Sequence, residues 1–419
     1  MQLWQGSIAA SMDPKAKILV VSDMNFGPYT LKAITKEEIK EVIECYGAAA
    51  ERAVKAGYDC LEFHLAHNYL PHSFLSAGLN HREDEYGGNF ENRCRFPLEV
   101  IDELRKRMPE GMPLFIRIDA QDDLLENGMS IEEVIRFCKI AKEHGVDVLD
   151  VSRGNIITAA SMYEVPPIDV PNVFNVENAA RIRKETGMVP VGVGRINTAA
   201  LAEELIADDK VDMVVMGRAQ LADPEFANKA KEGHVEDIVH CVGCNQGCYD
   251  GFCDVVNRPH ITCMRNPMIG HEAEYTLDPA EYTKKVWVIG GGLVGLETAD
   301  TLASAGCEVT ILEMKDSIGS DLGSLRKIAV MMKMQQLNVK MLTNSKVCKF
   351  TEEGIVLEDG TVVPCSCAVF AVGFHSNDSH LLAEACEKKQ IPFHVIGDAK
   401  AARRAIDAVA EGFEVGRQI

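Results

Sequence analysis

Residues 189–195, VPVGVGR, and residues 211–218, VDMVVMGR, are two apolar runs that each end in Gly-Arg. Apolar runs without alternation that follow helix-patterned segments are typical of parallel strands buried on both faces. Glycine lets backbone N–H groups approach an anion and arginine supplies charge, so two successive strands of this kind indicate the phosphate site of an α/β barrel. The alternative is a pair of glycine turns with surface arginines. The residues expected at the phosphate are Gly194, Arg195, Gly217 and Arg218.

The same alternation of helix and strand extends upstream to about residue 35. A capping box at Thr35 and Glu38 predicts the start of the first helix. Further helices are expected over residues 92–108, 130–144, 176–187 and 198–207, and strands from residues 60, 114, 146, 189 and 211. Gln2-Leu3-Trp4 is read as the tail of a sixth strand. We therefore predict an α/β fold, a (β/α)8-type barrel incomplete at its N-terminus, with an open doubly wound sheet as the alternative.

Composition narrows the class of partner. The 419 residues include 43 Lys and Arg against 63 Asp and Glu, a net charge of -20. So acidic a surface repels phosphate backbones and anionic lipids, which disfavours nucleic acid and membrane partners. No apolar stretch is long enough to span a bilayer, and residues 1–15 lack the pattern of a signal peptide. We expect a cytoplasmic protein with a small-molecule substrate; the oligomeric state is left open.

Four of the fourteen cysteines have the spacing C-x2-C-x3-C-x14-C, at Cys241, Cys244, Cys248 and Cys263. In a reducing compartment such a group is better explained by metal or cluster ligation than by disulfides. Three close thiolates and a more distant fourth can wrap a [4Fe-4S] cluster. A zinc ion held by the same four thiolates is the alternative.

A second motif, GGGLVG at residues 290–295, lies between an apolar strand and a helix. Glycines at these positions allow a tight turn and bring a pyrophosphate to the helix N-terminus. Glu313, at the end of the next strand, would bind a ribose 2′-hydroxyl and repel a 2′-phosphate, which favours NAD or FAD over NADP. A glycine turn without a ligand is the alternative. The predicted cofactor residues are Gly290, Gly292, Gly295 and Glu313.

A third group follows the strand that begins near residue 60. His64 and His67 are placed to polarise a carbonyl oxygen, and Tyr69 to deliver a proton. Catalytic groups of barrels lie at this end of the strands. A structural or metal-binding histidine pair is the alternative.

These motifs together resemble the old yellow enzyme family, and in particular its iron-sulfur branch of 2,4-dienoyl-CoA and 2-enoate reductases. The resemblance rests on HLAHNYLPHSFLSAGLNHREDEYGGNFENRCRF at residues 64–96, on VGVGRI, MGRAQLADP and CVGCNQGC, and on the glycine motif followed by HVIGDA. It implies that His64 and His67 bind the substrate carbonyl and that Tyr69 protonates an activated C=C bond. It also implies that FMN is held by Gln2, Arg117, Gly194, Arg195, Gly217 and Arg218, and that the cluster passes electrons to it.

The sequence departs from the family in three places. It looks shortened at the N-terminus, where the family has two further strands, and the stretch 153–165, where some reductases carry another catalytic group, holds no histidine. It has one dinucleotide motif where the family has two. Gly397-Asp398 resembles the closing FAD motif, so we interpret the C-terminal half as an NAD unit fused to remnants of an FAD unit, with bound FAD doubtful.

The predicted domains are 1–235, an FMN-binding barrel lacking its first strands; 236–283, an iron-sulfur segment and linker; and 284–419, a dinucleotide-binding domain. The predicted function is an oxidoreductase with FMN and a [4Fe-4S] cluster that uses NADH to reduce an α,β-unsaturated carbonyl compound, enoate-like or enoyl-CoA-like. The alternatives are a truncated, catalytically impaired remnant and a zinc-stabilised nucleotide-binding protein.

Overall fold

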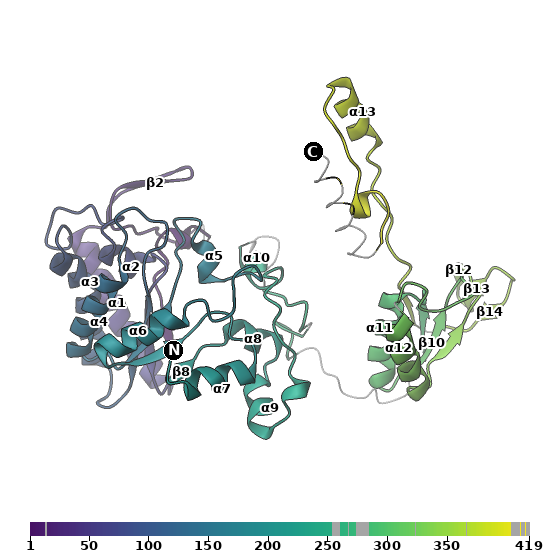
Figure 1. Cartoon of the computed structure of the whole chain (residues 1–419), viewed down its shortest axis with the longest axis horizontal. Coiled ribbons are helices and arrows are strands. Elements are labelled where there is room, and N and C mark those ends of the chain that lie inside the picture. Colours follow the sequence, from purple (N-terminus) through teal and green to yellow (C-terminus); the bar gives the residue numbers. More distant parts are fainter. Residues whose placement is uncertain are drawn as a thin grey trace. The chain divides into compact units, whose positions relative to one another are not determined.

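The structure, a computed structural model, falls into two units, Met1–Glu274 and Tyr275–Ile419 (Figure 1). It describes residues 1–12, 15–253, 260–266, 268–273, 285–322, 324–365, 367–403, 411 and 415. The expected linker therefore lies outside the described residues from 274 to 284. The separate iron-sulfur segment and the boundaries at 235 and 283 stay predictions.

Six parallel strands form the sheet of the first unit, in the order β1-β4-β5-β6-β7-β8. Their bounds are Gln2–Leu3 for β1, Leu61–Leu65 for β4, Leu114–Asp119 for β5, Val148–Ser152 for β6, Val189–Gly192 for β7 and Met213–Val214 for β8. Gln2 and Leu3 pair with Glu62 and Phe63, which confirms the sixth strand. Every residue of β6 is buried, as expected of a strand covered on both faces. The predicted α/β barrel-type fold is confirmed, with β1 and β8 as the sheet edges among the described residues.

Helices between the strands supply the cover of the sheet (Figure 1). The long ones are α1 (Lys36–Lys55), α3 (Phe90–Arg107), α4 (Ile131–Glu143), α6 (Val176–Thr186) and α7 (Ala199–Ala207). The predicted capping box is present: Thr35 accepts from the Glu38 N–H, and the Glu38 carboxylate accepts from the Thr35 N–H. The apolar faces of these helices bury large side chains such as Phe63, Phe96 and Phe137 in one core.

Shorter elements of this unit surround the C-terminal ends of the strands. They are the 3-10 helices η1 (Ser7–Met12) and η2 (Val235–Asp237), the hairpin of β2 (Met24–Phe26) and β3 (Tyr29–Leu31), and the helices α2 (Leu70–Leu75), α5 (Ser161–Glu164), α8 (Gly217–Ala222), α9 (Phe226–Glu232) and α10 (Tyr249–Phe252). The β2–β3 hairpin and α5 were not expected from the sequence.

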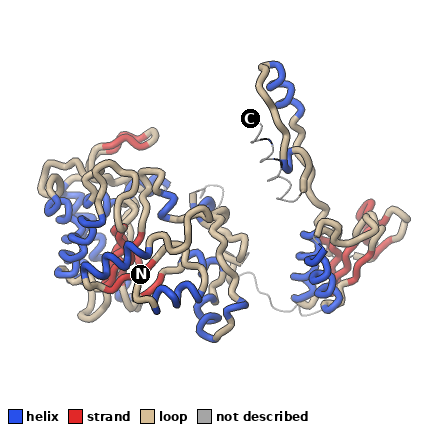
Figure 2. Tube along the Cα trace, in the orientation of Figure 1, coloured by secondary structure: helices blue, strands red, loops and turns tan. Residues whose placement is uncertain are grey.

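The second unit has a parallel sheet in the order β11-β10-β9-β15 and an antiparallel sheet in the order β12-β13-β14, both drawn in red in Figure 2. The strands are β9 (Lys285–Ile289), β10 (Glu308–Leu312), β11 (Lys340–Leu342), β12 (Val347–Thr351), β13 (Gly354–Leu357), β14 (Val362–Val363) and β15 (Ala368–Phe370). The helices are α11 (Leu293–Ser304), α12 (Ser324–Gln336), α13 (His380–Lys388) and the 3-10 helix η3 (Gly397–Ala399). The strand-helix-strand unit β9-α11-β10 confirms the elements expected around the glycine motif. β13 and β14 form an antiparallel hairpin.

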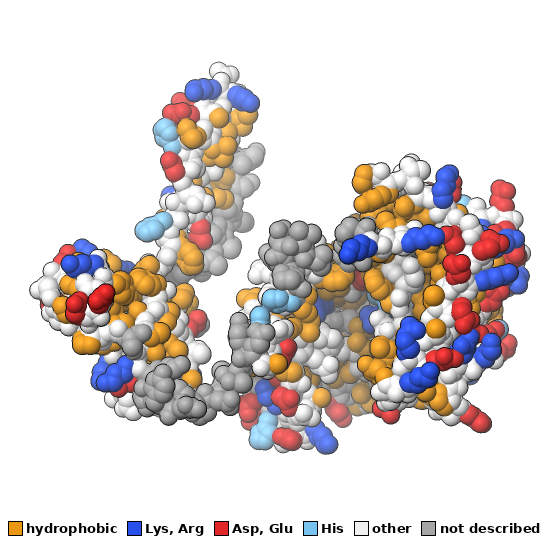
Figure 3. Space-filling model, turned by 180° about the vertical axis from the view of Figure 1, so that it is seen from behind, with side chains coloured by type: hydrophobic (Ala, Val, Ile, Leu, Met, Phe, Trp, Pro, Cys, Tyr) orange, Lys and Arg blue, Asp and Glu red, His pale blue; other side chains and the backbone are white. Residues whose placement is uncertain are grey.

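On the face drawn in Figure 3, acidic and basic side chains are interspersed over the first unit. Among the described residues, no helix has the length and apolar character needed to cross a bilayer.

Candidate active site

A cavity of about 200 Å³ opens at the C-terminal ends of β5 to β8. Its walls come from the strand ends and from the loop that follows β6. The predicted cofactor residues that line it are Arg117, Gly194, Arg195, Gly217 and Arg218. The two Gly-Arg strand ends therefore meet in one cavity, and Arg117 of β5 lines it with them.

The two Gly-Arg turns differ in local structure. Gly194 has φ +141°, a conformation that favours glycine, whereas no atom lies within 4 Å of the place where a Cβ on Gly217 would stand. Arg195 donates to the carbonyl oxygens of Ile168, at 2.9 Å, and Val170. The open space at Gly217 is the kind of cradle that a phosphate group needs. Arg117 Nε is buried without a hydrogen-bond partner among the described residues. A donor of this kind is available to a ligand in the cavity.

His64, His67 and Tyr69, the predicted catalytic residues, lie together beside this cavity. The His64 and His67 ring centroids are 5.1 Å apart, and the Tyr69 ring is 5.0 Å from His64. His67 and Asn68 both have positive φ, +61° and +56°. This strained backbone is held by hydrogen bonds, the His67 N–H donating to Asp119 and the Asn68 N–H to His72. The turn after β4 thus points both imidazoles and the phenol to one side.

Burial keeps both imidazoles neutral. It lowers the pKa of His64 to about 3, and that of His67 well below its ordinary value, with nearby positive charge acting in the same direction. A neutral imidazole offers one N–H donor and one acceptor. His64 Nδ1 is buried and has no hydrogen-bond partner among the described residues, as expected of an atom that awaits a ligand.

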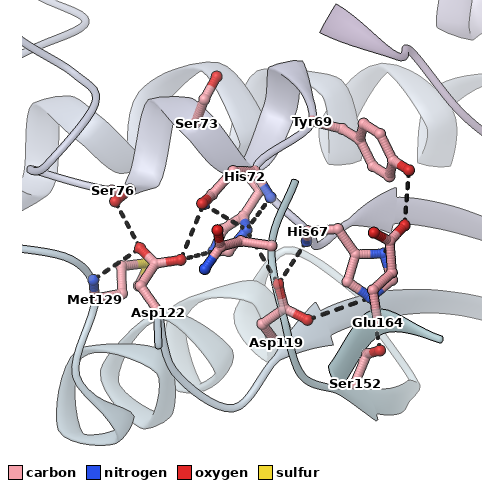
Figure 4. A network of polar contacts seen from close by, with 12 residues as sticks. His67, Tyr69, His72, Ser73, Ser76, Asp119, Asp122, Met129, Ser152 and Glu164 are labelled. Atoms are coloured by element: carbon pink, nitrogen blue, oxygen red, sulfur yellow. Dashed lines mark hydrogen bonds and ion pairs between the residues drawn. The ribbon is translucent and has the colours of Figure 1, made fainter. Parts of the chain in front are cut away.

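A network of buried polar side chains surrounds His67 and His72 (Figure 4). Asp119 accepts from the His67 N–H and lies 3.4 Å from His72 Nδ1, and burial raises the pKa of its carboxyl well above the usual range. His67 Nε2 is 2.8 Å from Ser152 Oγ. Asp122 accepts hydrogen bonds from Asn68 Nδ2 and Ser76 Oγ, at 2.9 and 2.6 Å. The orientation of the His67 ring is therefore set by contacts from the ends of β5 and β6.

Glu164 is a member of the site that sequence reasoning missed. Its Oε1 accepts a hydrogen bond of 2.8 Å from the Tyr69 hydroxyl and lies 3.4 Å from His67 Nδ1 (Figure 4). It also lines the large cavity. The sequence offers one signal: Glu164 lies in the stretch 153–165, where some reductases of the resembled family carry another catalytic group.

The flavin expectations for Gln2 and Arg117 have different outcomes. Arg117 reaches Asp150 Oδ2 at 2.9 Å and Ser152 Oγ at 3.2 Å within the cavity wall. Gln2 instead donates to Glu62 Oε2 at 2.5 Å on the neighbouring strand and is not part of that wall. Burial, with Asp150 nearby, raises the pKa of Glu62 to about 7. The structure therefore brings Arg117 to the cavity and leaves Gln2 in the adjoining strand pair.

The four predicted ligand cysteines line a second, small cavity of about 20 Å³, together with Arg218. Cys241 and Arg218 also line the large cavity, so the two cavities adjoin. Within the described ranges no three His, Cys, Asp or Glu side chains converge as ligands of one metal ion. Four cysteines that line one cavity are a donor set that either an iron-sulfur cluster or a zinc ion can use.

The glycine motif of the second unit forms the tight turn between β9 and α11. Gly290 has φ +109° and lies so close to Ala371 that a Cβ would stand 2.2 Å from its carbonyl oxygen; a Cβ on Gly295 would stand 1.8 Å from Gly290 O. Glu313 Oε2 accepts from the Gly291 N–H at 2.6 Å. Leu293, the first residue of α11, donates its N–H to Asp321 at 2.9 Å. Gly290, Gly292, Gly295 and Glu313 thus meet at one turn, as predicted.

Gly397 and Asp398 lie in η3 of the same unit. The Gly397 N–H donates to Glu411 Oε2 at 2.7 Å. Among the described residues, no hydrogen bond joins this pair to the Gly290 turn, so the predicted cofactor role of Gly397 and Asp398 has no local support.

Comparison with known proteins gives two overlapping matches. A profile of the NADH:flavin oxidoreductase / NADH oxidase family matches residues 1–237, and one of pyridine nucleotide-disulphide oxidoreductases matches residues 173–394. An NADH oxidase of Thermoanaerobacter brockii is 38% identical over 292 residues, 70% of this chain and 44% of that protein. A cinnamate reductase of Clostridium sporogenes is 33% identical over 308 residues, 70% of this chain and 45% of that protein. The chain therefore spans less than half the length of these two relatives.

Solved structures share the fold. A 2-naphthoyl-CoA reductase in complex with 2-naphthoyl-CoA aligns with a TM-score of 0.59 and 23% identity, covering 95% of this chain and 79% of that one. A histamine dehydrogenase from Rhizobium sp. 4-9 aligns with a TM-score of 0.64 and 18% identity, covering 100% and 83%.

Proposed function

This chain belongs to the NADH:flavin oxidoreductase / NADH oxidase family, and from that membership we propose that it reduces the activated C=C bond of an α,β-unsaturated carbonyl compound with electrons from NADH. The observation that carries the proposal is the cluster of two neutral imidazoles and a phenol beside a cavity lined by arginines. The cinnamate reductase relative, named for a conjugated acid, agrees with this substrate class.

The residues of the large cavity fit FMN. The arginines that line the cavity, the open space at Gly217, and the buried, unpartnered Nε of Arg117 suit a flavin with its phosphate. Arg195 and Arg218 would hold the phosphate, and Arg117 would lie at the ring system. When bound, FMN supplies the electron pair for reduction of the alkene.

The substrate is bound and protonated by side chains of the chain itself. His64 and His67, both neutral, would donate hydrogen bonds to the carbonyl oxygen, which withdraws electron density from the conjugated C=C bond. Tyr69 would deliver the proton to the α carbon from its hydroxyl. Asp119, Ser152 and the strained turn hold His67. The orientation of its imidazole is therefore set before substrate arrives.

The cysteine cavity fits a [4Fe-4S] cluster by the chemistry of its donors. Four cysteines line it, and four thiolates are the donor set that such a cluster uses. A cluster held by Cys241, Cys244, Cys248 and Cys263 would exchange single electrons with its surroundings. The adjoining walls of the two cavities suit such an exchange. The second unit would bind NADH at the Gly290–Gly295 turn, with Glu313 on the ribose.

Anaerobic purification with cofactor and metal analysis tests the proposal. We expect one FMN and four irons per chain, no stoichiometric FAD, and NADH oxidation that depends on cinnamate or another conjugated carbonyl compound. One zinc per chain without flavin absorbance would contradict the assignment of both cavities. Stoichiometric FAD together with bound NADH would contradict the interpretation of the C-terminal unit.

A further inference from the structure

Glu164 joins the predicted proton donor to the cavity. Its carboxyl group accepts the Tyr69 hydroxyl at 2.8 Å, lines the cavity, and keeps 12% of its side chain exposed. Tyr69 itself is 8% exposed, and its ring is packed against Trp4 and His64. The hydroxyl of Tyr69 therefore reaches the solvent side of the site through the carboxyl group of Glu164.

The environment of Glu164 favours its protonated form. Burial raises the pKa of the carboxyl, against the opposing effects of the Tyr69 hydrogen bond and the Arg117 charge. The result is a carboxyl group that holds a proton at higher pH than an exposed glutamate. Such a group can give its proton to a phenolate, which is a far stronger base.

The other ionisable neighbours of Tyr69 are poorer candidates for this transfer. His67 is neutral, because burial lowers its pKa well below the ordinary value. Asp119 has a fully buried side chain and already accepts the His67 N–H. Tyr249, whose charge acts on Tyr69, has its own pKa raised to about 12 by burial. Among these neighbours, Glu164 combines a direct hydrogen bond to Tyr69 with a place in the cavity wall.

We propose that Glu164 is the proton relay that restores Tyr69 after each turnover, an inference that rests on the proposed function. The alkene gains a hydride at its β carbon from the flavin and a proton at its α carbon from the Tyr69 hydroxyl. The Tyr69 oxygen, left as phenolate, takes the proton of the Glu164 carboxylic acid. The resulting carboxylate is reprotonated from water in the cavity, so that the cycle consumes one hydride and one solvent proton.

Glu164→Gln separates the first turnover from those that follow. The amide oxygen still accepts the Tyr69 hydroxyl, but the side chain has no acidic proton to return. Rapid mixing of the NADH-reduced holoenzyme with cinnamate should give one product per chain at close to the wild-type rate. Later turnovers should then be slower by about 100-fold or more. A distorted site would slow the first turnover as much as the later ones.

Chemical rescue and a matched variant complete the test. Glu164→Ala leaves room for a small acid, and added acetic acid should restore its later turnovers in proportion to the neutral acid present. Glu99→Gln is the control, because Glu99 accepts the Tyr86 hydroxyl at 3.0 Å away from the cavity. It should show neither the burst nor the rescue. Thermal unfolding of each variant checks that the chain is folded.

The outcomes distinguish the relay from the proposed function. A wild-type holoenzyme that reduces no conjugated carbonyl compound refutes the proposed function. If the wild type is active and Glu164→Gln turns over without a burst, at the wild-type rate or equally slowed in every cycle, the relay alone is refuted. Failure of acetic acid to restore Glu164→Ala also counts against the relay.

Discussion

Arg218 is the residue whose replacement tests the cavity assignment most directly, because it lines both cavities. Its Nη1 donates to Pro166 O at 2.8 Å and to Asn245 Oδ1 at 2.6 Å. Nε and Nη2 have no partner among the described residues, so the guanidinium can present two donors to one phosphate. Arg218→Met keeps the aliphatic stem and removes these donors and the charge.

The expected loss follows from the hydrogen bonds removed. A charge-assisted hydrogen bond contributes about 1.5–3 kcal/mol, and about 1.4 kcal/mol corresponds to a tenfold change in the dissociation constant. Loss of one such hydrogen bond weakens FMN binding by roughly 10- to 150-fold, so Arg218→Met, which removes both donors, should weaken it by at least that factor. The two lost internal hydrogen bonds should lower the free energy of unfolding by about 1–3 kcal/mol, since each contributes about 0.5–1.5 kcal/mol.

Quenching of flavin fluorescence on titration with the deflavinated chain measures the dissociation constant. Arg183→Met is the matched control, because Arg183 pairs with Asp209 and Asp212 at the surface and contributes nothing to the cavity wall. It should bind FMN as the wild type does. Unchanged affinity in a folded Arg218→Met variant would refute the placement of the flavin phosphate between the two Gly-Arg turns.

Three further predictions address the other parts of the chain. Tyr69→Phe should lower kcat by about 100- to 10,000-fold with little change in KM, because its ring contacts survive and only the proton is lost; unchanged kcat in steady-state assays removes Tyr69 from this role. Cys244→Ala should abolish the broad iron-sulfur absorbance and reduce the iron content, and retention of four irons per chain would contradict the ligand assignment. Gly295→Ala should destabilise the second unit by about 1–3 kcal/mol, because its Cβ would stand 1.8 Å from Gly290 O; unchanged thermal unfolding and NADH affinity would show that the turn accommodates the methyl group.

Local patterns predicted the elements that local physics determines. Unbroken apolar runs predicted the buried strands. The start of α1 could be predicted because Thr35 and Glu38 form reciprocal hydrogen bonds there. The two Gly-Arg strand ends were predicted to meet because parallel strands place their C-terminal ends at one edge. Arg195 and Arg218 do line one cavity.

What could not be predicted depends on contacts between distant residues. Glu164 meets Tyr69 across 95 positions, through a four-residue helix that carries no periodic signal. Gln2 was expected at the flavin, yet its amide is taken by Glu62 of the next strand, a pairing that the strand register imposes. The contact between Glu164 and Tyr69 and the position of Gln2 therefore depend on tertiary structure, which no single stretch of sequence contains.

In the turn between β9 and α11, two carboxylates of the protein itself accept hydrogen bonds from the backbone. The N–H groups of Gly291 and Leu293, at the start of α11, already donate to the carboxylates of Glu313 and Asp321. A dinucleotide phosphate that binds these N–H groups must replace the carboxylates of Glu313 and Asp321. Its binding free energy is therefore the difference between the hydrogen bonds gained and those lost. These internal hydrogen bonds reduce the net free energy that a dinucleotide can gain from the N–H groups of this turn.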